Sequence, residues 1–161
     1  WFFDGGRKSL VLTGNVGMGK STLMKATSMA IGQLYFYSLG SQRKTSMYVE
    51  CAELQTIYDN DQSKFDRLKH CDILFLDDLG VEPVVVSKYG NKTNLFIELL
   101  LCRYEEKKPT IITTNLKRND IVKNYCNSEL MQARVEDRLF ETYDFKVLQG
   151  NESFRIKNAK K

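Results

Sequence analysis

The sequence is poor in the residues that build metal clusters and disulfide scaffolds. Its 161 residues include one histidine, two prolines and four cysteines. Cys51, Cys71, Cys102 and Cys126 form no C-x-x-C pair, and the single His70 cannot complete a metal set with them. We therefore expect four reduced, mostly buried thiols in a cytoplasmic protein.

Long apolar runs are also missing. No stretch approaches the ~20 residues of a membrane-spanning helix. The apolar start at residues 1–3 is followed at once by Asp4 and then by Arg7 and Lys8, so we expect no signal peptide in this segment. The first residue is Trp1 and not methionine, so we expect the chain to be a piece of a longer protein.

The composition is that of a globular protein. Hydrophobic residues make up 42% and charged residues 27%, which excludes disordered and collagen-like chains. The length predicts a single domain over residues 1–161, with residues 1–8 as a linker and 157–161 as a flexible tail. The net charge of +4 permits a nucleic-acid partner without requiring one.

Strand and helix patterns alternate along the chain. Strands are predicted at residues 9–13, 46–50, 72–77, 110–114 and 145–148. Helices are predicted at residues 20–31, 52–58, 65–68, 93–106, 119–125 and 128–141, with a loop over residues 80–92. This alternation is typical of an α/β fold with a parallel sheet, in which the almost wholly apolar strand at 72–77 is central.

A glycine-rich segment follows the first strand. Residues 14–21 satisfy the pattern G-x-x-x-x-G-K-[ST], between a predicted strand and a predicted helix. Glycines let consecutive N–H groups point at phosphate oxygens, and the start of the helix adds its positive end. Lys20 would bridge the β- and γ-phosphates, and the Ser21 hydroxyl would bind Mg²⁺. The residues expected to contact a nucleotide are Gly14, Asn15, Val16, Gly17, Met18, Gly19, Lys20, Ser21 and Thr22.

Two acids end the central strand. Asp77 and Asp78 follow four apolar residues, at the edge of the sheet where α/β proteins bind ligands. Asp77 would hold Mg²⁺ through water, and Asp78 would polarise an attacking water molecule. A pair of solvated turn acids is the alternative. At the end of the next strand, Asn115 would orient that water without adding charge, unless it serves as a helix cap or in an Asx turn.

Three arginines near the end of the sequence are candidates for phosphate contacts. Arg134 and Arg138 lie four residues apart on one helix face, where like charges repel each other unless an anion is nearby. Either nucleotide phosphates, of this or a neighbouring subunit, or the local acids Asp137 and Glu141 would provide that anion. Arg155 is a further candidate for the γ-phosphate, with an ordinary surface arginine as the alternative.

Taken in order, these motifs resemble one family over nearly the whole chain. They are the loop at 14–21, L-D-D-L-G at 76–80, T-T-N at 113–115, R-V-E-D-R-L at 134–139 and Arg155. The chain is similar to the AAA+ ATPases of the DnaC/DnaI-type replicative helicase loaders and their relatives, the IstB-type transposition ATPases. The resemblance implies an AAA+ type P-loop NTPase fold. Its five-stranded parallel sheet of order 5-1-4-3-2 is sandwiched by helices, without a helical lid domain.

The resemblance also implies a role for each motif within one subunit. Lys20 and Ser21 match the Walker A residues, and Asp77 and Asp78 match the Walker B acids. Many AAA+ proteins have Glu in place of the second acid, and the shorter Asp is usual among helicase loaders. Asn115 matches the residue called sensor 1. Lys20, Asp78 and Asn115 are then catalytic, Ser21 and Asp77 bind Mg²⁺, and the nucleotide is ATP.

The arginines take different roles under the same resemblance. Arg138 matches the catalytic arginine finger that acts on the ATP of a neighbouring subunit, and Arg134 is its close neighbour. Arg155 matches the sensor 2 arginine, which contacts the γ-phosphate within its own subunit. These roles imply a homo-oligomer in the ATP state.

The function implied is ATP hydrolysis coupled to loading a replicative helicase onto single-stranded DNA. Helicase loaders carry a DNA-facing insert, which here corresponds to the region from Tyr35 to Lys44, with Phe36, Tyr37 and Arg43. Aromatic and basic residues suit base stacking and phosphate attraction, although core packing and solvated cations also explain them. A transposition-accessory ATPase, a P-loop small-molecule kinase and a passive ATP binder remain as alternatives.

Overall fold

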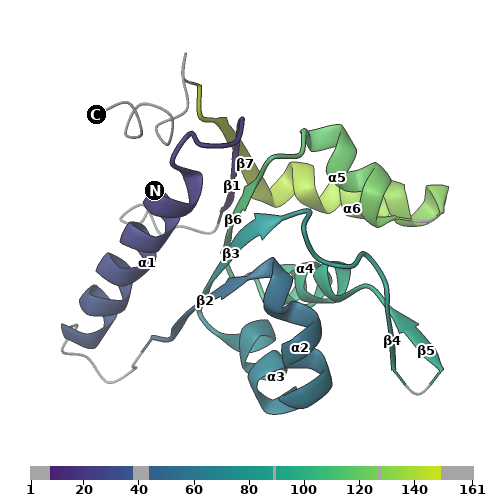
Figure 1. Cartoon of the computed structure of the whole chain (residues 1–161), viewed down its shortest axis with the longest axis horizontal. Helices are drawn as coiled ribbons and strands as arrows, with labels where there is room; N and C mark the ends of the chain where they lie inside the picture. The colour runs from purple at the N-terminus through teal and green to yellow at the C-terminus, as the bar shows by residue number, and fades with distance from the viewer. Residues whose placement is uncertain (1–7, 38–43, 89, 127, 150–161) are drawn as a thin grey trace.

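A computed structural model describes residues 8–37, 44–88, 90–126 and 128–149 and shows a five-stranded parallel sheet (Figure 1). The strand order is β2-β3-β6-β1-β7. The strands are β1 (Ser9–Thr13), β2 (Ser46–Glu50), β3 (Ile73–Leu79), β6 (Thr110–Thr114) and β7 (Tyr143–Val147). Counted over these five strands, this is the predicted order 5-1-4-3-2, and β6 lies between β3 and β1 as expected.

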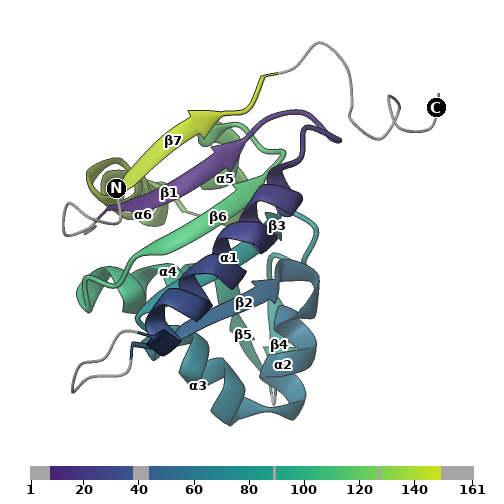
Figure 2. The same cartoon turned by 90° about the vertical axis from the view of Figure 1, so that its left-hand side faces the viewer.

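Helices cover both faces of the sheet unequally. Of the described helices, only α1 (Lys20–Tyr37) packs on one face, and the others lie on the opposite face (Figures 1 and 2). Those helices are α2 (Leu54–Asn60), α3 (Gln62–His70), α4 (Leu95–Glu105), α5 (Arg118–Tyr125) and α6 (Glu129–Thr142), with a single 3-10 turn at Cys51–Glu53 before α2. Among the described residues no helix forms a separate lid over the sheet, and none is long and apolar enough to cross a membrane.

The strand β3, predicted to be central, is an interior strand next to the edge strand β2, and it supplies apolar side chains to both faces. Ile73 and Phe75 pack in one cluster with Met24 of α1. Leu74 and Leu76 belong to the larger cluster on the other face. Successive side chains of a strand point to opposite faces, so a strand buried on both faces must be apolar throughout, as the sequence predicted.

Several predicted boundaries were wrong. The helix predicted at 20–31 runs on to Tyr37, and the last strand begins at Tyr143 instead of 145. The loop predicted at 80–92 contains an antiparallel hairpin of β4 (Val86–Lys88) and β5 (Asn91–Thr93). Three-residue strands are too short to show an alternating pattern, which is why the hairpin was missed.

The cysteines match the expectation from the sequence. All four are free thiols, of which Cys51, Cys71 and Cys126 are buried. Burial raises the pKa of the Cys51 thiol. The buried thiols therefore act as small apolar groups of the core.

The buried Arg103 joins three elements at the edge where the strands begin. Its side chain is 1% exposed. The guanidinium donates hydrogen bonds to Thr110 Oγ1 at 2.8 Å and to the carbonyl oxygens of Leu68, Cys71 and Pro109 at 3.0, 2.8 and 2.8 Å. It thereby satisfies carbonyl groups at the carboxyl end of α3, where a positive charge is favourable.

We expect Arg103→Met to destabilise the fold by about 3 kcal/mol or more, because several buried carbonyl groups lose a charged hydrogen-bond donor. Chemical denaturation measures this loss. Arg67→Met, at an exposed position of α3, is the matched control and should change stability by less than about 0.5 kcal/mol. Equal stability of the two variants would contradict the structural role of Arg103.

Candidate functional site

The glycine-rich segment forms a tight loop between β1 and α1. Gly14 has φ +146°, and a Cβ placed there would lie 2.4 Å from the carbonyl oxygen of Leu148. Leu148 in turn donates its N–H to the Thr13 carbonyl oxygen at 2.8 Å. The chain after β7 therefore passes so close to the loop that only glycine fits. Gly19 also has a positive φ, of 83°, directly before the helix begins.

Lys20 is buried inside this loop. Only 7% of the residue is exposed. Its ammonium donates hydrogen bonds to the carbonyl oxygens of Gly14 and Asn15, at 2.7 and 2.9 Å, and to Asn115 Oδ1 at 2.7 Å. A buried ammonium requires such partners. Phosphate oxygens are acceptors of the same kind, so the loop and Lys20 fit a phosphate group.

Asp77 is held by hydroxyl groups from both neighbouring strands. It is 2% exposed. Tyr48 of β2 donates its hydroxyl to Oδ2 at 2.5 Å, and Thr113 of β6 donates to Oδ1. Burial and the hydrogen bond to Asp77 raise the pKa of Tyr48 above its usual range. Both carboxylate oxygens are thereby oriented, and a metal contact through water would leave these hydrogen bonds intact.

A bulge in β3 directs Asp78 toward Asn115. The pairing of β3 with β6 shifts register between Leu76 and Leu79. Asp78 has φ +59°, a conformation that aspartate tolerates better than most residues. Its N–H donates to Thr113 Oγ1 at 2.8 Å, and its Oδ1 accepts a hydrogen bond from Asn115 Nδ2 at 3.4 Å. The bulge thus brings the second acid to the edge of the sheet next to the amide.

Asn115 links Lys20 of the phosphate loop to Asp78 of β3. Its oxygen accepts a hydrogen bond from Lys20, and its nitrogen donates to Asp78. The alternative role as a helix cap does not apply, because the residue before α5 is Lys117, with no side-chain cap. Lys20, Asp78 and Asn115 therefore meet at the carboxyl edge of the sheet, and the buried Asp77 precedes Asp78 in β3.

Sequence reasoning missed the two hydroxyl groups that hold Asp77. Thr113 belongs to the T-T-N motif, but its side chain was given no role. Tyr48 is level with Phe75 in the parallel pairing of β2 and β3. That register brings the Tyr48 ring near Asp77, and only knowledge of which strands are neighbours could have revealed it.

Other predicted residues lie around this cluster or outside the described part. Ser21 and Thr22 open α1 directly after Lys20, and Val16 is exposed at the loop surface. Arg155 and residues 38–43 lie outside the described residues. Tyr35, Phe36 and Tyr37 form the end of α1, and Lys44 is exposed.

Arg134 and Arg138 lie on α6, away from the Lys20 cluster. Arg138 stands one turn before Thr142, whose hydroxyl donates to the Arg138 carbonyl oxygen at 2.6 Å. The next residue, Tyr143, begins β7, so Arg138 lies near the edge where the strands begin. Within the described part of the chain, neither arginine forms an ion pair with a carboxylate. Direct ion pairs with Asp137 and Glu141, which were the alternative to phosphate contacts, are therefore absent among the described residues.

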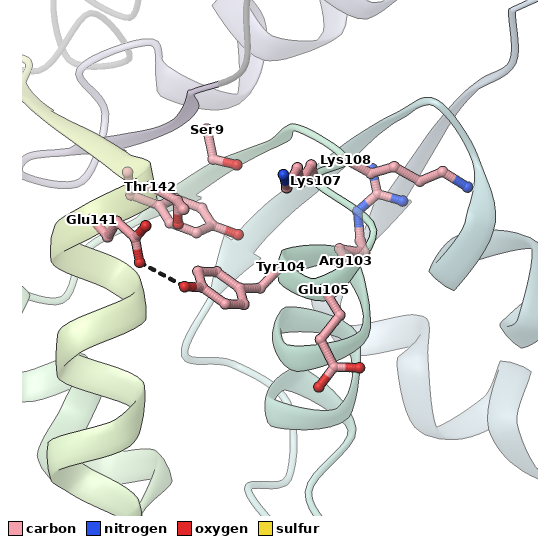
Figure 3. Close-up of a pocket in the computed structure, with 9 residues that line it drawn as sticks. Ser9, Arg103, Tyr104, Glu105, Lys107, Lys108, Glu141 and Thr142 are labelled. Carbon is pink, nitrogen blue, oxygen red and sulfur yellow. Dashed lines mark hydrogen bonds between the residues drawn. The ribbon is translucent and has the colours of Figure 1, made fainter.

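The Arg138 side chain packs on Tyr104 of α4. The guanidinium carbon lies 5.0 Å from the centre of the Tyr104 ring, in cation–π geometry. The Tyr104 hydroxyl donates to Glu141 Oε2 at 2.6 Å, and Figure 3 shows these two side chains directed at each other between α4 and α6. This hydrogen bond raises the pKa of Tyr104. A pocket of about 340 Å³ adjoins the pair, with Lys107 and Lys108 in its wall.

One further grouping was not expected from the sequence. Donor atoms of His70, Cys102 and Glu106 lie within 4.8 Å of one another. Glu106 already accepts hydrogen bonds from His70 Nδ1 at 2.6 Å and from Lys108 at 2.7 Å, and both hold its pKa below the usual range, with Lys108 the larger cause. The grouping is therefore a surface network of hydrogen bonds and one Lys108–Glu106 ion pair between the end of α3 and the residues after α4, and we assign no metal to it.

Comparisons with solved structures place the fold among AAA+ proteins. A crystal structure of DnaI is 26% identical, with a TM-score of 0.66 over 89% of this chain and 71% of that one. A DnaC helicase loader is also 26% identical, with a TM-score of 0.58 over 89% and 80%. The replication initiator DnaA bound to AMPPCP and single-stranded DNA is 17% identical, with a TM-score of 0.60 over 96% and 44%, and shows the fold alone.

Comparison with curated proteins found no significant relative. A family model for IstB-like ATP binding proteins, in contrast, matches residues 3–161. That match spans the phosphate loop, the acidic strand end, Asn115 and the arginines of α6, which are the features that the structure arranges around the sheet. The chain is an AAA+ ATP-binding domain and belongs to the family of IstB-like ATP-binding proteins.

Proposed function

We propose that this chain hydrolyses ATP as a switch that assembles on DNA, and that its task is to load a replicative helicase onto single-stranded DNA. The observation that carries the proposal is the position of Asn115, bonded to both Lys20 and Asp78. A passive ATP binder has no need of an amide next to a carboxylate. In a hydrolase, such a pair orients and polarises the attacking water.

The residues at this edge fit ATP and Mg²⁺. The loop at Gly14 has no space for a side chain, and Lys20 is surrounded by acceptor oxygens that phosphate oxygens can replace. In this assignment Ser21 and Asp77 hold Mg²⁺, which prefers oxygen ligands and retained water, and which neutralises charge on the phosphates when bound. Tyr48 and Thr113 keep the Asp77 carboxylate in place.

Hydrolysis then requires a second subunit. In our assignment Arg138 acts on the ATP of a neighbouring copy, with Arg134 beside it, and Arg155 contacts the γ-phosphate within its own subunit. The location of Arg138 near the opposite edge of the sheet supports the first role, because it leaves the guanidinium outside its own nucleotide site. ATP would join the subunits and hydrolysis would release them.

Two observations bear on the task of the switch. Structural similarity to DnaI and to the DnaC helicase loader favours helicase loading, with the replicative helicase as partner. The IstB-like family model favours a transposition-accessory ATPase of the same fold, which differs chiefly in its partner protein. The DNA contact that we propose for the region from Tyr35 to Lys44 rests on its aromatic and basic residues, which suit base stacking and phosphate attraction.

Removing the charge of Lys20 tests the nucleotide site. Lys20→Ala should weaken ATP binding about 10- to 100-fold, because a charge-assisted contact to the phosphates is lost. Isothermal titration calorimetry measures the affinity. Lys123→Ala removes an ammonium at an exposed position of α5 and should leave the affinity unchanged. An unaltered affinity for folded Lys20→Ala would contradict the site assignment.

Removing Arg138 tests the shared site. Arg138→Ala should keep ATP affinity and lose turnover by about a thousandfold, the usual contribution of an arginine that acts from a neighbouring subunit. Mixing it with Asp78→Asn, which keeps the phosphate loop and a native Arg138, should restore phosphate release. Full turnover of Arg138→Ala alone would contradict the role of this residue.

A further inference from the structure

We propose that Tyr104 is a positioning residue that presents Arg138 to the neighbouring subunit, and that it does so by keeping Glu141 away from the guanidinium. The inference rests on the proposed shared site. It adds a residue that acts on the site through Arg138. None of the sequence motifs includes Tyr104.

The Tyr104 ring limits the orientations that the Arg138 guanidinium can adopt. Arginine has a long side chain with several freely rotating bonds, and fixing it in one orientation costs entropy. The guanidinium carbon of Arg138 lies over the Tyr104 ring, 5.0 Å from its centre, so the ring contacts the charged group and restricts its movement. A cation supported by an aromatic face still has its N–H donors free along the edge. The ring therefore orients Arg138 without consuming its donors.

Glu141 is the acid that would otherwise pair with Arg138. Glu141 follows Arg138 by three residues on α6, so the two side chains are neighbours on the helix surface and are expected to pair. They form no ion pair in the structure, because Glu141 accepts the Tyr104 hydroxyl at 2.6 Å instead. One side chain thus performs two tasks. Its ring supports the cation, and its hydroxyl occupies the carboxylate that would otherwise neutralise it.

The two tasks can be separated by substitution. Tyr104→Phe keeps the ring and releases Glu141, so turnover of the assembled protein should fall about twofold. Glu141→Gln removes the competing charge, and the double variant Tyr104→Phe with Glu141→Gln should return to the wild-type rate. Tyr104→Leu removes both contributions and should fall about three- to tenfold, with incomplete recovery when combined with Glu141→Gln.

The measurement is phosphate release at saturating ATP, at high protein concentration and with single-stranded DNA. ATP affinity of each variant, measured by calorimetry, should equal the wild-type value because Tyr104 lies away from the Lys20 cluster. Tyr104→Leu mixed with Asp78→Asn should regain activity, since the partner supplies a native Tyr104 and Arg138. A merely structural role of Tyr104 predicts lower thermal stability, no rescue by Glu141→Gln and no recovery on mixing.

Arg138→Ala in the same assay distinguishes a failure of the shared site from a failure of the positioning role of Tyr104. If that variant keeps full turnover, the shared site is wrong and the positioning role falls with it. If Arg138→Ala is inactive while Tyr104→Leu works at the wild-type rate, only the positioning role is wrong. If Glu141→Gln fails to restore Tyr104→Phe, the proposed diversion of Glu141 is overturned.

Discussion

The ammonium of Lys20 has to be held among oxygen atoms, and much of the site follows from how the chain supplies them. A charge that is almost fully buried is costly unless it is paired and hydrogen-bonded. Two of its acceptors come from the phosphate loop and one from Asn115. This arrangement requires β6 to lie beside β1, and it also places the Asn115 amide next to Asp78 on β3. The contacts of the site therefore require this strand order.

The domain has two functional edges in this account. The carboxyl edge of the sheet gathers Lys20, Asp77, Asp78 and Asn115, whereas Arg138 lies near the edge where the strands begin. The two groups are held by separate contacts. In this account a single copy cannot bring its own Arg138 to its own nucleotide site through small movements. Assembly of copies head to tail would join the two edges, and this is how ATP binding would be coupled to association.

The sequence predicts the carboxyl edge well because the relevant signals are local. The phosphate loop is a continuous motif, and Asp77 and Asn115 each follow a strand whose apolar pattern is clear. Tyr48 and Thr113 escaped prediction because their contacts depend on which strands are adjacent and in what register. The bulge at Asp78 and the three-residue hairpin strands leave no periodic pattern to recognise.

Contacts at the edge where the strands begin were even harder to predict from local sequence patterns. The spacing of Arg134 and Arg138 predicts a shared helix face, and the structure confirms that both lie on α6. In our proposal, whether Glu141 pairs with Arg138 depends on Tyr104, which belongs to another helix and is 34 residues away from Arg138 by number. Similarly, Arg103 appears in the sequence as one more charge in a helix. Only the packing of α4 against α3 reveals that it satisfies buried carbonyl groups.

The central claim is that turnover belongs to an assembly, and the rate of phosphate release from ATP per subunit tests it most directly. The rate should be measured over a wide range of protein concentrations, with and without single-stranded DNA. The account predicts that the rate per subunit rises with concentration and rises further with DNA. A rate that is independent of both would contradict the shared site and favour a monomeric kinase or a passive ATP binder.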